Sequence, residues 1–207
     1  MSKKVLIVST SLRAGSNSDI MARECARGAK EAGHEVEYIS LKGKKIEYCI
    51  GCLTCQMKGS CVLKDDMAEI MAKVKDAQVI VYATPIYYYE MSGQMKTLLD
   101  RLNPLFASDY SFRDIYMIAT AAENEESAFE KAYSGLKGWV DCFEKARLKG
   151  IVCGGGITDA GDAGNHADIM RKAYKAGNIE YSVLKELNER VAKRLSVRVI
   201  SLRDVRK

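Results

Sequence analysis

An unbroken apolar run, followed by a polar loop and a helical pattern, constrains this chain most strongly. Val5 to Val8 is apolar at every position, as in a strand buried on both faces of a sheet. The next residues are dense in hydroxyl groups, and residues 20–30 have a helix-like content of Ala, Arg and Glu. Such a unit favours a phosphate, because free N–H groups and the helix dipole lie at the helix N-terminus. An ordinary capped turn is the alternative, since Ser and Asn also cap helices.

Apolar runs alternate with helical patterns along the rest of the chain. After the first strand, further strands are predicted at 35–41, 78–83, 112–121 and 148–153, and helices at 65–76, 93–102, 125–146, 166–176 and 180–194. Five strands separated by helices predict an α/β fold, with a five-stranded parallel sheet and helices on both faces. The pattern over 125–146 is expected to be interrupted near Gly135 and Gly138, and residues 42–60 to form a long connection.

Loops after three of the predicted strands are expected to form one crevice. In parallel sheets, ligands bind beyond the carboxyl ends of the strands, near the switch point of the strand order. The loop at 9–18 offers hydroxyl groups and Arg13, which suit a terminal monophosphate. The loop at 84–92 offers Pro85 and three consecutive tyrosines, which suit a flat redox-active ring, and the loop at 120–124 completes the crevice. The chain has no glycine-rich dinucleotide or nucleotide triphosphate motif.

Three motifs together resemble a known family. Ser11-Leu-Arg13, then Ser16-Asn17-Ser18, then Thr84-Pro-Ile-Tyr87 followed by residues 92–96, resemble the NADPH-dependent FMN reductases, which have a flavodoxin-like fold. The similarity extends over residues 3–160. It implies FMN as cofactor, NAD(P)H as co-substrate, a small acceptor such as a quinone or a flavin, and a homodimer or homotetramer.

The resemblance also implies a set of FMN-binding residues. The phosphate would bind Ser11, Arg13, Ser16, Asn17 and Ser18, the isoalloxazine would lie along Pro85, Ile86, Tyr87 and Tyr88, and Thr120 and Ala121 would close the site, with Ser9 and Thr84 as further members. No catalytic side chain is predicted, because the flavin itself carries the chemistry. His34 and His166 lack a neighbouring pattern that would indicate acid–base work.

Four cysteines within thirteen residues form a second candidate site: Cys49, Cys52, Cys55 and Cys61. Four thiolates at this spacing can hold an iron–sulfur cluster or a tetrahedral zinc ion. The spacing resembles that of the iron–sulfur flavoproteins, a branch of the same family in which a 4Fe–4S cluster lies beside FMN. This resemblance implies an alternative function, electron transfer with ferredoxin-like partners and no direct NAD(P)H oxidation. Zinc, a regulatory disulfide and free thiols remain open alternatives.

Composition and charge argue against several other classes of protein. The chain is 47% apolar and 29% charged, as a globular protein is, so its 207 residues are expected to form one domain. This domain would carry a cysteine-rich loop at 47–62 and a C-terminal extension from about 165 to 207. The net charge of +5 comes from scattered Lys and Arg, which does not indicate nucleic-acid binding.

The expected location follows from the absence of membrane and secretion signals. No apolar stretch is long enough for a membrane span, and the N-terminus lacks a signal-peptide pattern. We therefore expect a cytoplasmic protein, in which structural disulfides are rare. Cys25, Cys142 and Cys153 lie in helix or strand patterns and are expected to be small buried residues.

Overall fold

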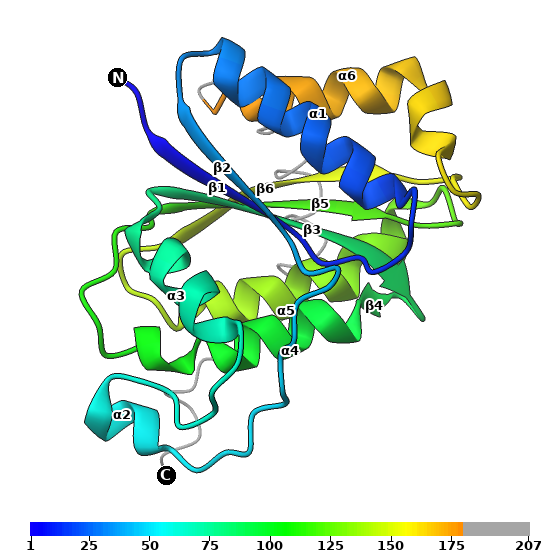
Figure 1. Cartoon of the computed structure of the whole chain (residues 1–207). Helices are drawn as coiled ribbons and strands as arrows, with labels where there is room; N and C mark the ends of the chain where they lie inside the picture. Colours follow the sequence, from blue (N-terminus) through cyan, green and yellow to red (C-terminus); the bar gives the residue numbers. More distant parts are fainter. Residues whose placement is uncertain (180–207) are drawn as a thin grey trace, which may run out of the picture.

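A parallel sheet lies between two layers of helices in the computed structural model, which describes residues 1–179 (Figure 1). Its parallel strands are β1 (Lys4–Ser9), β2 (Glu35–Ser40), β3 (Val79–Tyr87), β5 (Asp114–Thr120) and β6 (Arg147–Gly154). They pair in the order β2-β1-β3-β5-β6, and the two-residue β4 (Glu90–Met91) pairs antiparallel with the end of β3. The predicted flavodoxin-like α/β fold is confirmed, with β4 as an addition.

The helices divide between the two faces of the sheet. Figure 1 shows α1 (Asn17–Glu31) and α6 (Ala167–Gly177) on one face, and α3 (Met67–Asp76), α4 (Gly93–Arg101) and α5 (Glu130–Asp141) on the other. Shorter helical turns are α2 (Thr54–Lys58), η1 (Asn103–Leu105), η2 (Glu126–Phe129) and η3 (Asp162–Asn165). None of the helices described up to residue 179 has the length and apolar character needed to cross a membrane.

The apolar run at the start of β1 serves both layers at once. Leu6 and Val8 belong to the core beneath α3, α4 and α5, whereas Val5 and Ile7 belong to the core beneath α1 and α6. This alternation is the period-2 geometry of a strand that is buried on both faces. The layer of α1 and α6 is close-packed, because a Cβ atom on Gly28 would lie 2.1 Å from the Tyr174 carbonyl oxygen.

Several local predictions were wrong. The third strand does not end at residue 83, because Thr84 and Pro85 continue its pairing with β5 and Ile86 pairs with Met91 in the hairpin. Pro is rare inside strands, but Pro85 lies within β3 and pairs with Thr120. α5 runs without a break through Gly135 and Gly138. Gly135 allows Met91 to pack closely against the helix, because a Cβ atom at this position would lie only 3.0 Å from Met91 Cε.

Two further differences concern the cysteine-rich region and the end of the chain. The long connection predicted at 42–60 contains the short helix α2. Cys142 is exposed just beyond the end of α5, where its thiol donates to the Gly138 carbonyl oxygen, so its predicted burial was wrong. Cys25 is buried as predicted, and Cys153 is partly buried. The helix predicted at 180–194 and most of the C-terminal extension lie outside the described residues.

Candidate flavin site and cysteine loop

A pocket of about 220 Å³ lies at the carboxyl ends of the central strands. Its walls come from the segments that follow β1, β5 and β6 and from the end of β3. They supply Ser11, Arg13, Ser16, Asn17, Pro85, Ile86, Tyr87, Thr120, Ala121, Ala122, Ile157 and Thr158. The predicted convergence of the three loops on one crevice is therefore what the structure shows.

The polar wall of the pocket has the donor groups that a phosphate needs. Ser16 and Ser18 are buried, and their hydroxyl oxygens lie 3.1 Å apart. α1 begins at Asn17, so the N–H groups of its first turn have no partner within the helix. Asp19, the acid in this turn, is engaged by Tyr38 and Arg23. Burial alone would raise the pKa of Asp19, but these hydrogen bonds outweigh burial and hold that pKa below its ordinary value.

The segment after β6 closes onto this wall. The Arg13 guanidinium donates to the Thr158 carbonyl oxygen at 2.8 Å. The Asn17 amide donates to the Asp159 carbonyl oxygen at 2.9 Å and accepts from the Ala163 N–H at 3.0 Å. Arg13 has further N–H groups to offer, whereas both ends of the Asn17 amide are engaged. Asn17 thus lines the pocket but also clamps residues 159–163, and side-chain binding of phosphate by Asn17 stays a prediction.

The opposite wall is formed by the β3–β4 hairpin. Pro85 and Ile86 give it an apolar surface, and Tyr87 lies at its rim with a relative exposure of 53%. Tyr88 and Tyr89 form the turn with φ values of +51° and +66°, in the left-handed region that L-residues rarely adopt. Tyr88 is 98% exposed at the tip and is not among the residues that line the pocket, so its contact with a flavin ring stays a prediction.

The hydroxyl groups of Thr10, Thr84 and Ser92 form a buried hydrogen-bond network next to the pocket residue Pro85. The Thr10 hydroxyl donates to the Ala83 carbonyl oxygen at 2.9 Å and lies 3.2 Å from the Ser92 hydroxyl. Thr84 donates to the same Ser92 oxygen at 3.1 Å, and Ser92 also caps α4 by accepting from the Met95 N–H. The network ties the ends of β1 and β3 to the start of α4. Ser9, Ser18 and Thr84 are buried and are not among the residues that line the pocket.

Sequence reasoning missed three residues of the pocket. Ala122 directly follows the predicted Ala121, and Ile157 and Thr158 follow β6. The signal for the last two was available, since β6 is the strand next to β5 and its carboxyl end lies at the same edge of the sheet.

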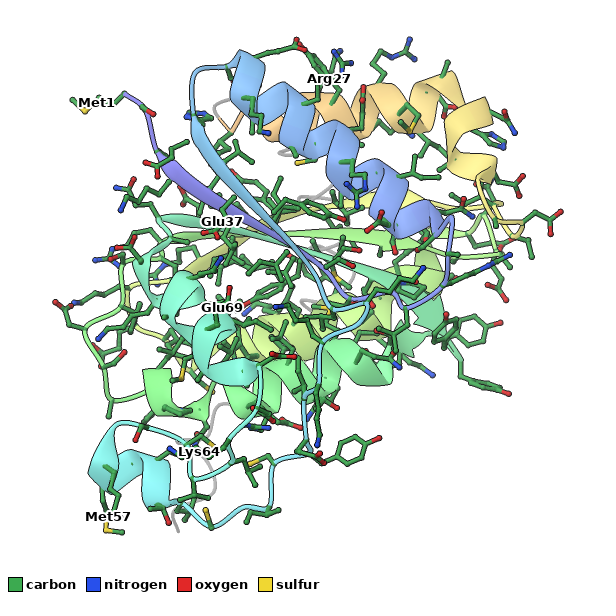
Figure 2. The ribbon with its side chains drawn as sticks, viewed as in Figure 1. Met1, Arg27, Glu37, Met57, Lys64 and Glu69 are labelled. Carbon is green, nitrogen blue, oxygen red and sulfur yellow. The ribbon has the colours of Figure 1, made fainter. Side chains whose placement is uncertain are left out.

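The cysteine loop, residues 47–65, contains α2 at the foot of Figure 1, and none of its residues lines the pocket. Cys49 and Cys52 are exposed, and Cys55 and Cys61 are partly buried. Figure 2 shows this loop at the foot of the molecule, where Met57 points outward. Within residues 1–179, no three Cys, His, Asp or Glu side chains are placed to hold one metal ion.

The cysteine loop and the pocket are held at opposite ends of α4. Ser92 at the start of this helix bonds Thr84 beside the pocket, whereas Arg101 at its end bonds Asp65 at the end of the loop. The nine residues of α4 correspond to about 14 Å at 1.5 Å per residue. Within one chain the cysteine loop thus lies about one helix length from the pocket, and a cluster beside the flavin stays a prediction.

A buried ion pair closes the base of the cysteine loop. The Arg101 guanidinium donates to both Asp65 carboxylate oxygens, at 2.6 and 2.9 Å, and to the Glu47 carbonyl oxygen at 2.6 Å. Asp65 in turn accepts from the Glu47 N–H at 2.8 Å. Both charged side chains are only 1% exposed, and the Arg101 hydrogen bonds hold the pKa of Asp65 below its ordinary value.

Strand order, helix layers and a ligand pocket at the carboxyl edge define a flavodoxin-like protein. A model of the NADPH-dependent FMN reductase family matches residues 3–132. The chain belongs to this family.

Curated relatives match part of the chain, and a solved structure shares its fold. An iron–sulfur flavoprotein of Methanocaldococcus jannaschii is 40% identical over 102 residues, which cover 49% of this chain and 53% of that protein. One of Archaeoglobus fulgidus is 40% identical over 88 residues, covering 42% and 40%. The chain thus spans about half the length of these curated relatives, or less. The structure of an NAD(P)H:quinone oxidoreductase from Methanothermobacter marburgensis has a TM-score of 0.70 at 20% identity, covering 87% of this chain and 98% of that one, and supports the fold.

Proposed function

We propose that this chain binds FMN in the pocket and oxidises NAD(P)H, passing the electrons to a small acceptor such as a quinone or a flavin. One observation carries the proposal. A hydroxyl-lined helix N-terminus faces the apolar wall formed by Pro85 and Ile86 across a single pocket. One wall suits a phosphate and the other suits a flat aromatic ring, and FMN contains both. Membership of the FMN reductase family supports the same cofactor.

The chain's own residues have distinct tasks in this proposal. Ser11, Ser16 and the first-turn N–H groups of α1 bind the phosphate, and Arg13 adds positive charge beside it. Pro85 and Ile86 contact one side of the ring, and Ala121 and Ile157 narrow the pocket. When bound, FMN supplies the hydride and electron chemistry, so the protein's part is to bind and orient it.

A second candidate function concerns the cysteine loop. Its four cysteines, and the iron–sulfur flavoproteins among the relatives, support a 4Fe–4S cluster bound by Cys49, Cys52, Cys55 and Cys61. The thiols suit a cluster in kind. Cluster binding requires the exposed Cys49 and Cys52 to approach Cys55 and Cys61. Such a protein would exchange single electrons with a ferredoxin-like partner.

The flavin proposal is tested by measuring FMN affinity. We expect Ser16→Ala to weaken FMN binding about 10- to 100-fold, because a hydrogen bond to a charged group contributes about 1.5–3 kcal/mol. Ser134→Ala, which removes an exposed hydroxyl on α5, serves as the matched control and is expected to bind FMN as the wild type does. Equal affinity of Ser16→Ala and Ser134→Ala would contradict the phosphate assignment.

The two candidate functions are separated by an anaerobic spectrum with flavin, iron and zinc quantified on one sample. Flavin without iron, together with NAD(P)H oxidation, supports the reductase. Flavin with about four irons per chain, and no reaction with nicotinamides, supports the electron-transfer protein. We also propose a homodimer or homotetramer, which the exposed tyrosines of the β3–β4 hairpin support and light scattering would test.

A further inference from the structure

The segment between β6 and α6 is bound to the loop that precedes α1. Residues 155–165 pass beside the N-terminus of α1 (Figure 1). The Gly161 N–H donates to the Gly15 carbonyl oxygen at 2.9 Å. The two segments are also in close contact, because a Cβ atom on Gly15 would lie 3.3 Å from Ala160 Cβ. The position of the segment and the geometry of the proposed phosphate site are therefore set together.

One peptide unit of this segment lies between two charged side chains. Its carbonyl oxygen, that of Thr158, accepts from the Arg13 guanidinium at 2.8 Å. Its N–H group, that of Asp159, donates to the Asp162 carboxylate at 2.7 Å. The C=O and N–H of a trans peptide point in opposite directions, so the cation and the anion bond opposite sides of the unit. Each charge faces the end of the peptide dipole that it favours, and each bond polarises the other.

The Asp162 carboxylate holds this peptide unit in one orientation. The same carboxylate oxygen also accepts from the Thr158 N–H at 3.1 Å, so two successive N–H groups are bound to it. Asp162 begins η3, is partly buried, and is not among the residues that line the pocket. Arg13 is exposed, and an exposed Arg side chain samples many rotamers unless a fixed acceptor holds it. The acceptor that holds Arg13 is thus oriented by Asp162.

We propose that Asp162 is a positioning residue of the phosphate site: through this peptide unit it holds the Arg13 guanidinium ready for the phosphate of FMN. One guanidinium nitrogen bonds the carbonyl oxygen, and the remaining N–H groups stay available for the phosphate. Because the side chain is ordered before the ligand arrives, FMN binding does not bear the entropic cost of ordering it. This inference rests on the proposed binding of FMN. It adds a residue that lies outside the pocket and beyond residues 3–132, which the family model matches.

The sign of the effect distinguishes positioning from a simple effect of charge. Asp162 is negative, so removing it would strengthen the binding of an anionic phosphate if charge alone mattered. Releasing the Arg13 guanidinium from its fixed position acts in the opposite direction and weakens that binding. Weaker FMN binding in Asp162→Ala is therefore the result that positioning predicts.

The test measures the affinity of the full chain for FMN and for riboflavin, which lacks the phosphate, by titrations followed through flavin fluorescence. We expect Asp162→Ala to weaken FMN binding about 3- to 10-fold, the equivalent of one net hydrogen bond, and to leave riboflavin binding unchanged. Asp162→Asn keeps an oxygen that accepts N–H groups and is expected to recover part of the affinity. The control, Asp168→Asn, removes an exposed carboxylate from the first turn of α6 and should match the wild type.

A double variant tests whether Asp162 acts through Arg13. Once Arg13→Met has removed the guanidinium, Asp162→Ala should cause no further loss of FMN affinity. Should Asp162→Ala fail to fold, Asp162→Asn takes its place in this comparison.

The outcomes separate this inference from the proposed function. Losses that add in Arg13→Met/Asp162→Ala would overturn the inference and leave FMN binding standing. FMN affinity in Asp162→Ala equal to or above that of the wild type would do the same, as would an equal loss for riboflavin. A wild-type protein that binds no FMN would overturn both.

Discussion

Replacing Arg101 by Met is expected to destabilise the whole domain, because it leaves a buried carboxylate without its partner. Arg101 and Asp65 are each only 1% exposed, and three donor–acceptor distances of 2.6, 2.6 and 2.9 Å surround the guanidinium. Removing one partner of such a buried pair costs about 3–5 kcal/mol. A domain is stable by about 5–15 kcal/mol in total, so this one substitution removes a large share of the free energy of unfolding.

The measurement is urea unfolding at pH 7, followed by circular dichroism. The matched control is Lys96→Met, which breaks an ion pair of similar length, 2.7 Å to Asp100, on the exposed side of the same helix. That exposed pair is expected to contribute about 0.3–0.5 kcal/mol. The double variant Arg101→Met/Asp65→Asn removes both charges, keeps an oxygen to accept the N–H groups, and should cost less than the sum of the single changes.

The test compares the loss of unfolding free energy when the buried pair is broken with the loss when the exposed pair is broken. Equal losses in Arg101→Met and Lys96→Met, with unchanged m-values, would refute the reasoning, because the buried carboxylate would then carry no penalty. Strict additivity in the double variant would refute it as well, since the two charges would then not interact.

Three other predictions concern acid, thiols and the hairpin. The hydrogen bonds from Arg101 hold the pKa of folded Asp65 below its ordinary value of 3.8. The contribution of Asp65 to stability is therefore present above pH 3.8 and is lost as the pH falls through the folded pKa. Unfolding free energies measured between pH 3 and 7 should fall less steeply in acid for Asp65→Asn than for the wild type. Burial raises the pKa of the Cys25 thiol to about 12. Iodoacetamide at pH 8 should therefore label the exposed Cys142 in the native protein but label Cys25 only after unfolding, as measured by peptide mass spectrometry. Equal labelling of both thiols in the native protein would contradict the fold. Replacing Tyr88-Tyr89 by Asn-Gly should stabilise the domain by about 1–2 kcal/mol, because Asn and Gly tolerate positive φ; a lower melting temperature would contradict strain at this turn.

The candidate site was predictable where it depended on short stretches of chain. The polar loop after β1 and the Pro85-Ile86-Tyr87 segment lie next to the strands that position them, so their convergence followed from the parallel sheet alone. Ile157 and Thr158, which follow β6, belong to no motif, so only the position of β6 at the same edge of the sheet pointed to that segment. Their place depends on backbone carbonyls that meet Arg13 and Asn17 across more than 140 positions of sequence.

The sequence by itself determined the α/β class, the order of strands and helices and the family, because apolar period, helix caps and short motifs are local properties of the chain. Only the tertiary structure decided that Asn17 clamps residues 159–163, that Arg101 closes the cysteine loop, and that this loop lies a helix length from the pocket. These arrangements are contacts between distant residues. Their geometry is set by how the helices pack on the sheet, and packing leaves no periodic pattern in the sequence.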